Sequence, residues 1–160
     1  MNIKKPRPRD RQFLFLALVP AYFILVGFFL QSPGEILQGI FTIIREPDFL
    51  ITDYFIIGGV GAAFVNAGIL TLVSIGIVYG LGMDFDGHTI TSACLMFGFS
   101  LFGKNLLNIW AIMLGVFLYA RYHRTSVSRY IYIGYYGTSL SPIITQVMQM
   151  WELPIPVRMG

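Results

Sequence analysis

The 160-residue chain is 56% hydrophobic and only 12% charged, with a formal net charge of +3. An ordinary soluble domain has about a quarter of its residues charged, so this composition excludes one and indicates an all-α integral membrane protein with about four to five hydrophobic helices. No basic stretch is interleaved with aromatic residues, so a nucleic-acid partner is not expected, and the single Cys94 excludes an internal disulfide.

The first eleven residues are basic. They contain five lysines and arginines, two prolines and one acidic residue, Asp10. Positive charge gathers on the cytoplasmic side of membrane spans. Residues 1–11 are therefore predicted to be a cytoplasmic tail, and residues 12–160 a single transmembrane domain of a multi-pass protein of the cell inner membrane. The apolar run 12–30 would be the first span, from inside to outside.

A short helix is predicted over residues 33–44. Ser32 would be its N-cap, with Pro33 at the first helical position and Glu35 completing a capping box, and Pro47 would end it. The helix suits the membrane interface, or a re-entrant position, better than a span. Its apolar side is expected to carry Ile36, Leu37, Ile40, Ile43 and Ile44.

Residues 52–79 form the longest apolar run and are predicted to be one central spanning helix. Small residues recur along it every four positions, which leaves a face where another helix can approach closely. Asn66 on this face is either an amide that hydrogen-bonds to a neighbouring helix or a polar group that lines a solute path; both interpretations bury it. The expected helix-packing residues are Gly58, Gly59, Ala62 and Ala63.

The loop after the central helix carries Asp84, Asp86 and His88 at alternate positions. An extended loop with this spacing could hold a divalent cation. Asp86 and Gly87 before Thr89 also have the pattern of a turn followed by a helix cap. The cap is the favoured interpretation, and neither a metal site nor a cofactor is predicted.

The apolar segment 89–102 is short for a span, and Gly103, Lys104 and Asn105 interrupt it before residues 106–120. Two short helices could form a hairpin whose tip carries Lys104 to the outer side or to a water-filled vestibule. Alternatively, one broken helix crosses and leaves Lys104 near the midplane. The hairpin is favoured because it returns a second basic cluster to the side of the tail. That cluster is Arg121, His123, Arg124 and Arg129.

The last hydrophobic segment, residues 130–151, has tyrosines near one end and Trp151 at the other, like the aromatic belts of a spanning helix. Pro142 kinks it, because proline cannot donate a hydrogen bond to the Thr138 carbonyl. Either nearby Ser and Thr hydroxyls satisfy a simple kink, or the irregular backbone lines a cavity.

Three stretches carry a resemblance: PDFLITDYFIIGGVGAAFVNAGIL, DGHTITSACLMFGFSLFGKNLLNIWAIMLGVFLYA and YYGTSLSPI. Together they resemble an uncharacterised family of bacterial and archaeal multi-spanning membrane proteins, known as a domain of unknown function. The resemblance covers nearly the whole chain after the basic tail. Members of that family carry a second related half, so this chain resembles their N-terminal half. The resemblance implies either a dimer or a piece of a longer protein, and it implies no activity.

No pattern of a catalytic site stands out, so an enzyme is not expected. The breaks at Gly103 and Pro142 favour a channel or secondary transporter for a small molecule or ion, assembled as a homo-oligomer or with a second related half. The alternative is a non-transporting membrane subunit or scaffold that packs against partner helices within the lipid bilayer.

The transport hypothesis predicts which residues border the path. Helix ends leave N–H and C=O groups that need partners, so polar side chains at the two breaks should line one cavity. The helix start at Thr89 and the charge of Lys104 slightly favour an anionic or dipolar solute over a metal ion. The path candidates are Asn66, Thr89, Thr91, Ser92, Lys104, Asn105, Thr138, Ser139 and Ser141.

Overall fold

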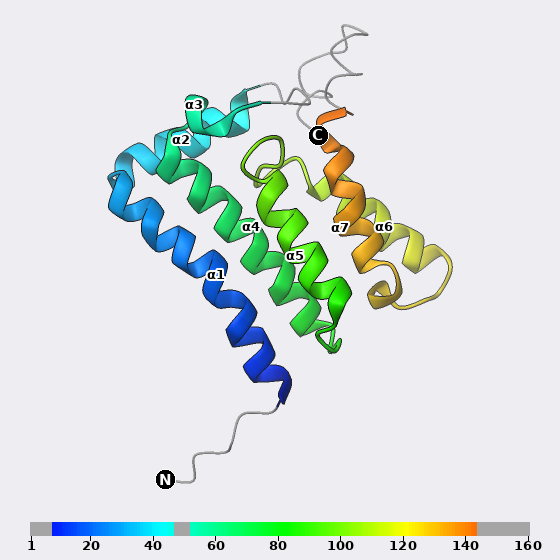
Figure 1. Cartoon of the computed structure of the whole chain (residues 1–160). Helices are drawn as coiled ribbons and strands as arrows, with labels where there is room; N and C mark the ends of the chain where they lie inside the picture. The colour runs from blue at the N-terminus through cyan, green and yellow to red at the C-terminus, as the bar shows by residue number, and fades with distance from the viewer. Residues whose placement is uncertain (1–7, 47–51, 144–160) are drawn as a thin grey trace, which may run out of the picture.

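A computed structural model describes residues 8–46 and 52–143 of the chain. Within these ranges every regular element is helical (Figure 1), which confirms the all-α class. The elements in chain order are α1 (Pro8–Leu30), α2 (Pro33–Arg45), α3 (Tyr54–Ile57), α4 (Val60–Gly80), α5 (Gly87–Phe99), α6 (Trp110–Tyr122), the 3₁₀ turn η1 (Val127–Arg129), α7 (Ile131–Gly137) and the 3₁₀ turn η2 (Thr138–Leu140).

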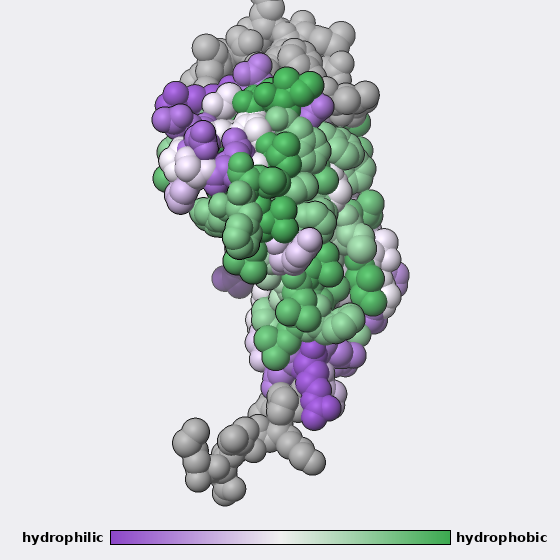
Figure 2. Space-filling view, turned by 60° about the vertical axis from the view of Figure 1, so that its left-hand side comes forward, coloured by the Kyte–Doolittle hydropathy of each residue, from purple (hydrophilic) through white to green (hydrophobic). Residues whose placement is uncertain are grey.

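Two of the described helices, α1 with 23 residues and α4 with 21, are long and apolar enough to cross a membrane. They pack side by side (Figure 1), and most of α4 is covered by protein whereas most of α1 is exposed. On the side where α1 lies, hydrophobic side chains cover the middle of the surface and hydrophilic ones gather towards both ends (Figure 2). The exposed hydrophobic residues of α1 are Leu14, Phe15, Leu18, Val19, Tyr22, Leu25, Phe28, Phe29 and Leu30.

Helix α1 begins inside the predicted polar tail. The Arg9 guanidinium lies 4.6 Å from the centre of the Tyr79 ring and donates to the Tyr79 carbonyl, and the Tyr79 hydroxyl donates to the Asp10 carboxylate at 2.9 Å. Residues 8–11 of the predicted tail are therefore part of a helix, and the end of α4 supplies partners for the charges of Arg9 and Asp10.

The predicted central helix is two helices. Gly59 has a φ of +84°, which L side chains rarely adopt, and it separates the single turn of α3 from α4. The Ala62 N–H in the first turn of α4 donates to the side-chain oxygen of Gln31 at 2.9 Å, so the end of α1 caps this break. Gly58 and Gly59 thus lie in the break rather than on a continuous helix face.

The small residues of α4 pack against helices of the same chain. Ala62 and Ala63 are fully buried in a cluster with Ile43 and Tyr54. A Cβ atom on Gly39 of α2 would lie 2.6 Å from the Ala62 Cβ and would overlap the Gly58 carbonyl. The close approach predicted for this face therefore occurs between α4 and α2.

Helix α2 has the predicted start, with a complete capping box between Ser32 and Glu35, and it ends at Arg45. Pro47, the predicted stop, lies outside the described residues. The buried stripe consists of Ile36, Gly39 and Ile43, whereas Leu37 is 60% exposed. Of the predicted apolar side, protein covers Ile36 and Ile43 because α4 approaches α2 at Gly39, and Leu37 is left on the surface.

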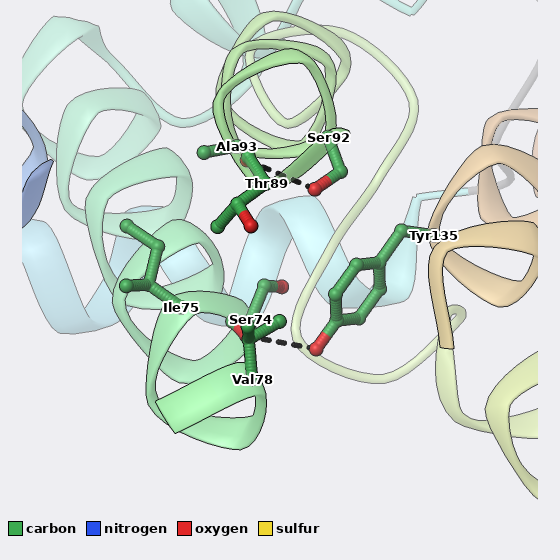
Figure 3. A pocket seen from close by; sticks show the side chains of 7 residues that line it. All are labelled: Ser74, Ile75, Val78, Thr89, Ser92, Ala93 and Tyr135. Carbon is green, nitrogen blue, oxygen red and sulfur yellow. Dashed lines mark hydrogen bonds between the residues drawn. The ribbon is translucent and has the colours of Figure 1, made fainter. Parts of the chain in front are cut away.

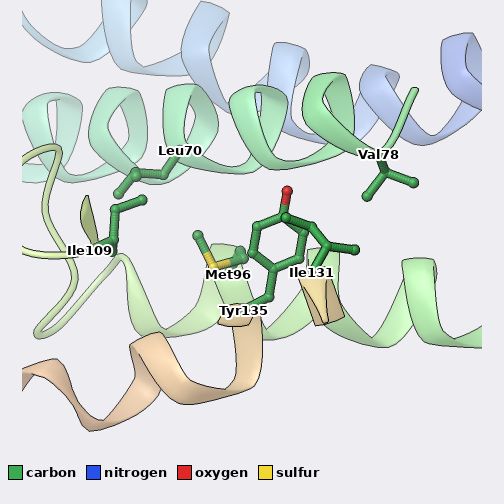
Figure 4. Close-up of a cluster of buried hydrophobic side chains, with 6 residues drawn as sticks. All are labelled: Leu70, Val78, Met96, Ile109, Ile131 and Tyr135. Atoms are coloured by element: carbon green, nitrogen blue, oxygen red, sulfur yellow. The ribbon is translucent and has the colours of Figure 1, made fainter. Parts of the chain in front are cut away.

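The second half of the described chain packs on the other side of α4. One hydrophobic cluster joins α4, α5, α7 and the turn before α6 (Figure 4); it contains Leu70, Val78, Met96, Ile109, Ile131 and Tyr135. Helices α5 and α6 run in roughly opposite directions (Figure 1), as in the favoured hairpin. Helix α7 passes into η2 at Thr138. The rest of the predicted final span, residues 144–151, lies outside the described residues.

Candidate functional site

The two breaks predicted at Gly103 and Pro142 are in contact with each other. The first is the turn region 100–109 between α5 and α6, and the second is η2 with Pro142. Gly103 has a φ of +128°, and a Cβ atom there would lie 2.9 Å from the Pro142 Cγ. The two breaks are thus packed directly together at this point.

Lys104, next to Gly103, is completely buried, so the prediction that the hairpin tip exposes Lys104 is wrong. Its Nζ lies 3.4 Å from the Met96 Sδ, 3.5 Å from the Tyr135 carbonyl oxygen and 5.2 Å from the centre of the Phe99 ring. In the part of the chain that the structure describes, these contacts include no carboxylate. A buried amine without an acidic partner costs free energy, which makes Lys104 a candidate for function.

Two asparagines shape the backbone after Lys104. The Asn105 side-chain oxygen accepts from the Leu107 N–H at 2.8 Å and from the Asn108 N–H at 2.9 Å. The Asn108 side-chain amide donates to the Gly103 carbonyl at 2.8 Å. Asn105, a path candidate, is buried and contributes here to holding the turn.

Asn66 connects α4 to the same turn. Its side chain is fully buried, and its Nδ2 donates to the Ser100 carbonyl at 2.8 Å and to the Lys104 carbonyl at 2.9 Å. These are the contacts of an amide that joins helices, while its Oδ1 has no partner among the described residues. The structure therefore favours the first of the two interpretations of Asn66.

The break at Pro142 satisfies most of its own polar groups. The Ser141 Oγ donates to the Thr138 carbonyl at 2.9 Å, which is the carbonyl that Pro142 leaves without its helical donor. The Thr138 Oγ1 donates to the Tyr135 carbonyl at 2.7 Å and lies 3.5 Å from the Met96 Sδ. The Ser139 Oγ is buried and has no partner within the described ranges.

Thr89 and Ser92 belong to a neighbouring polar group. They line a small pocket between α4, α5 and α7 (Figure 3), in which the side chains leave no room for a water molecule. The Tyr135 hydroxyl donates to the Ser74 carbonyl at 2.8 Å, and the Thr89 hydroxyl lies 2.6 Å from the Tyr132 hydroxyl. The lining residues are Ser74, Ile75, Val78, Thr89, Ser92, Ala93 and Tyr135.

One path candidate lies apart from the others. Thr91 is exposed, and its hydroxyl donates to the Gly87 carbonyl of its own helix at 2.9 Å.

Asp86 is the N-cap of α5, as predicted. Its carboxylate accepts a hydrogen bond from the Thr89 N–H, and this bond holds the pKa of the carboxyl below its usual value. Across residues 8–46 and 52–143, no three His, Cys, Asp or Glu residues come together as a metal site would require.

Sequence reasoning missed two central residues. Met96 supplies the sulfur between Lys104 and Thr138, and Tyr135 bridges the two polar groups with its carbonyl at one end and its hydroxyl at the other. Met96 looked like one apolar residue among many, and Tyr135 like part of an aromatic belt. No local pattern distinguishes them, because their contacts come from residues more than 30 positions away or across a break.

Comparison with known proteins places this arrangement in a family. No curated protein and no solved structure matches the chain. Residues 32–160 match the family described as "Protein of unknown function (DUF1576)". The match begins after α1, so the likeness starts later than the end of the basic tail. Because the match covers well over half of the chain, the chain belongs to this uncharacterised family.

Proposed function

We propose that the chain spans the inner membrane with its N-terminus in the cytoplasm. The support is the length and apolar surface of α1 and α4, with hydrophilic side chains near both ends of the exposed face (Figure 2). The start of α1 and the turn between α6 and η1 lie towards the same end of the molecule (Figure 1). This orientation agrees with the tendency of basic residues to stay in the cytoplasm.

Within that membrane, we propose a channel or secondary transporter for a small solute. One observation carries the proposal: Lys104 is fully buried where the two helix breaks meet, with no acidic partner among the described residues. Ionisable groups at membrane depth are expensive and commonly mark substrate or ion pathways, and broken helices are where transporters expose backbone groups to a solute.

The tight packing implies that this is a closed state. The neighbouring pocket has no room for water, and Gly103 and Pro142 touch. Transport would require α7 and η2 to move away from the α5–α6 turn. A second related half, or a second copy of the chain, would complete the path, since the two long helices among the described residues are too few to enclose a solute path.

The same packing favours one other function, a non-transporting membrane subunit. Asn66 bonds across to the turn, and Ser141 satisfies the carbonyl at the proline break. Polar groups that satisfy one another in this way hold helices together without any solute. Exposed helix α1 would then face lipid or a partner.

A flux assay in liposomes separates the two functions. Proteoliposomes containing the purified chain are shrunk in glycerol or urea, or in potassium chloride or potassium formate with the potassium ionophore valinomycin, so that potassium can follow the anion, and their re-swelling is followed by stopped-flow light scattering. We expect faster re-swelling than in empty liposomes for at least one solute. Lys104→Met should slow it roughly tenfold or more, the effect of losing one hydrogen bond to a charged group.

Thr91→Val is the matched control, because Thr91 is exposed and bonded only within α5. It should re-swell at the wild-type rate. If correctly inserted wild-type protein re-swells no faster than empty liposomes with every solute, the scaffold function is the one to keep.

A further inference from the structure

Two hydrogen-bond donors of different elements converge on one sulfur atom. The Lys104 Nζ lies 3.4 Å and the Thr138 Oγ1 3.5 Å from the Met96 Sδ. The same two donors also share the Tyr135 carbonyl oxygen, at 3.5 Å and 2.7 Å. All four residues are at most 2% exposed, so no bulk solvent reaches this point.

The sulfur is a poor partner for the Lys104 ammonium, whereas the single O–H of Thr138 already donates to the Tyr135 carbonyl. A thioether is only a weak acceptor, and an ammonium group has three N–H bonds to satisfy. The Phe99 ring, 5.2 Å from Nζ, offers the charge a further weak attraction. The described surroundings therefore leave the ammonium charge largely uncompensated. The Thr138 hydroxyl lies beside it, and it would have to turn from the Tyr135 carbonyl to donate to an anion.

We infer that Lys104 and Thr138 form a binding site for a small monovalent anion such as chloride, with the Met96 sulfur occupying the anion position in the closed state. A chloride ion is similar in size to a sulfur atom, and it accepts hydrogen bonds far better. Methionine is unbranched and flexible, so in this proposal the Met96 side chain turns away to vacate the position. The anion then neutralises the buried charge.

In naming the solute class of the protein, this inference rests on the transport function proposed above. The binding itself does not require flux. The test is therefore a binding measurement. The purified wild-type chain in mild detergent is unfolded thermally in sodium chloride and in sodium gluconate at equal ionic strength, because gluconate is too large for the site. We expect chloride to raise Tm by roughly 3–6 °C at ten times its dissociation constant, and Tm should go on rising with the logarithm of the chloride concentration.

Two variants locate the site. Lys104→Met should abolish the chloride-dependent rise, and it should fold, because it replaces an uncompensated buried charge by an apolar chain of similar length. Thr138→Val should weaken chloride binding about tenfold, as expected for losing one hydrogen bond to a charged partner. If Lys104→Met fails to fold, Thr138→Val decides the test.

The matched controls are Arg45→Met, which removes an exposed cation, and Thr91→Val, which removes an exposed hydroxyl. Both should keep the full chloride effect. A rise in Tm with formate as well as with chloride supports a site for small monovalent anions in general. A rise in Tm with chloride alone supports a halide site. The inference is overturned if wild-type Tm is the same in chloride and gluconate, or if Lys104→Met keeps the effect.

The two proposals fail in different ways. Chloride binding without any flux would leave an anion site in a non-transporting subunit. If the wild-type Tm does not depend on chloride and flux persists in Lys104→Met, the protein would be a transporter whose solute binds elsewhere.

Discussion

At the scale of single residues, Asn66 shows how a buried amide joins distant parts of the chain. Its Nδ2 donates to the carbonyls of Ser100 and Lys104, in the turn where α5 ends. Outside the regular helices, no backbone N–H of the described residues donates to either carbonyl. The amide therefore holds the position of Lys104 as well as the contact between α4 and the turn.

We expect Asn66→Ala to lower the free energy of unfolding by about 1–3 kcal/mol, because it removes the side-chain donor of two buried carbonyls. Thermal unfolding in detergent measures the change. Gln38→Ala, which removes an exposed amide on α2, should change stability by no more than about 0.5 kcal/mol. Equal stabilities of the two variants would show that Asn66 contributes no net hydrogen-bond energy.

At the scale of helices, glycines set the distance between α1 and α4. A Cβ atom on Gly68 would lie 2.8 Å from the Pro20 carbonyl oxygen of α1 and would overlap the Ile24 side chain. Gly76, two turns further along α4, has nothing within 4 Å of the corresponding position. The same substitution at these two positions therefore separates helix packing from intrinsic helix propensity.

Gly68→Ala should destabilise the protein by about 1–3 kcal/mol, because α1 has to move away from α4. Gly76→Ala should be neutral or stabilising by up to about 1 kcal/mol, since alanine favours a helix over glycine. Thermal unfolding of both variants under one set of conditions provides the comparison. A similar loss in both would mean that α1 does not pack on α4 as closely as the structure has it.

The packing of α4 also decides what a substitution at Ala62 can test. Ala62 is fully buried within the chain, against α2. A bulky residue there is expected to disturb the fold of the single chain, so it is no test of an oligomer. The exposed face of α1 remains the surface that lipid or another subunit can cover.

At the scale of the whole molecule, the course of the helices places the start of α1 and the basic turn before η1 at one end. Helix α1 runs away from that end and α4 returns to it, and α5 and α6 repeat this course as a hairpin (Figure 1). Basic residues tend to remain in the cytoplasm. The tail and the turn before η1 are therefore expected on the cytoplasmic side, with α2 on the opposite side.

Cysteine labelling in intact cells tests this orientation. In a Cys94→Ala background, a membrane-impermeant maleimide should label Gly34→Cys in intact cells, because Gly34 is exposed at the start of α2. Lys4→Cys and Arg129→Cys should react only after the cells are broken. Labelling of Arg129→Cys in intact cells would contradict the hairpin and require a single crossing between α5 and η1.

Local sequence determined the helical class, the capped starts of α2 and α5, and the positions of the irregular points near Gly103 and Pro142. These features depend on residues within one or two helical turns, such as Glu35 returning to Ser32 or Ser141 reaching the Thr138 carbonyl. Composition also indicated apolar helices long enough for a membrane, although only two of the described helices have that length.

Only the tertiary structure decided which of these features meet. Lys104 was expected at an exposed tip and is buried, because α4, α5 and α7 enclose the turn that carries it. The convergence of Lys104 and Thr138 on Met96 joins residues that are far apart in sequence. Such contacts depend on how helices pack and on which small residues let them approach, and neither is encoded in the neighbours of any one residue.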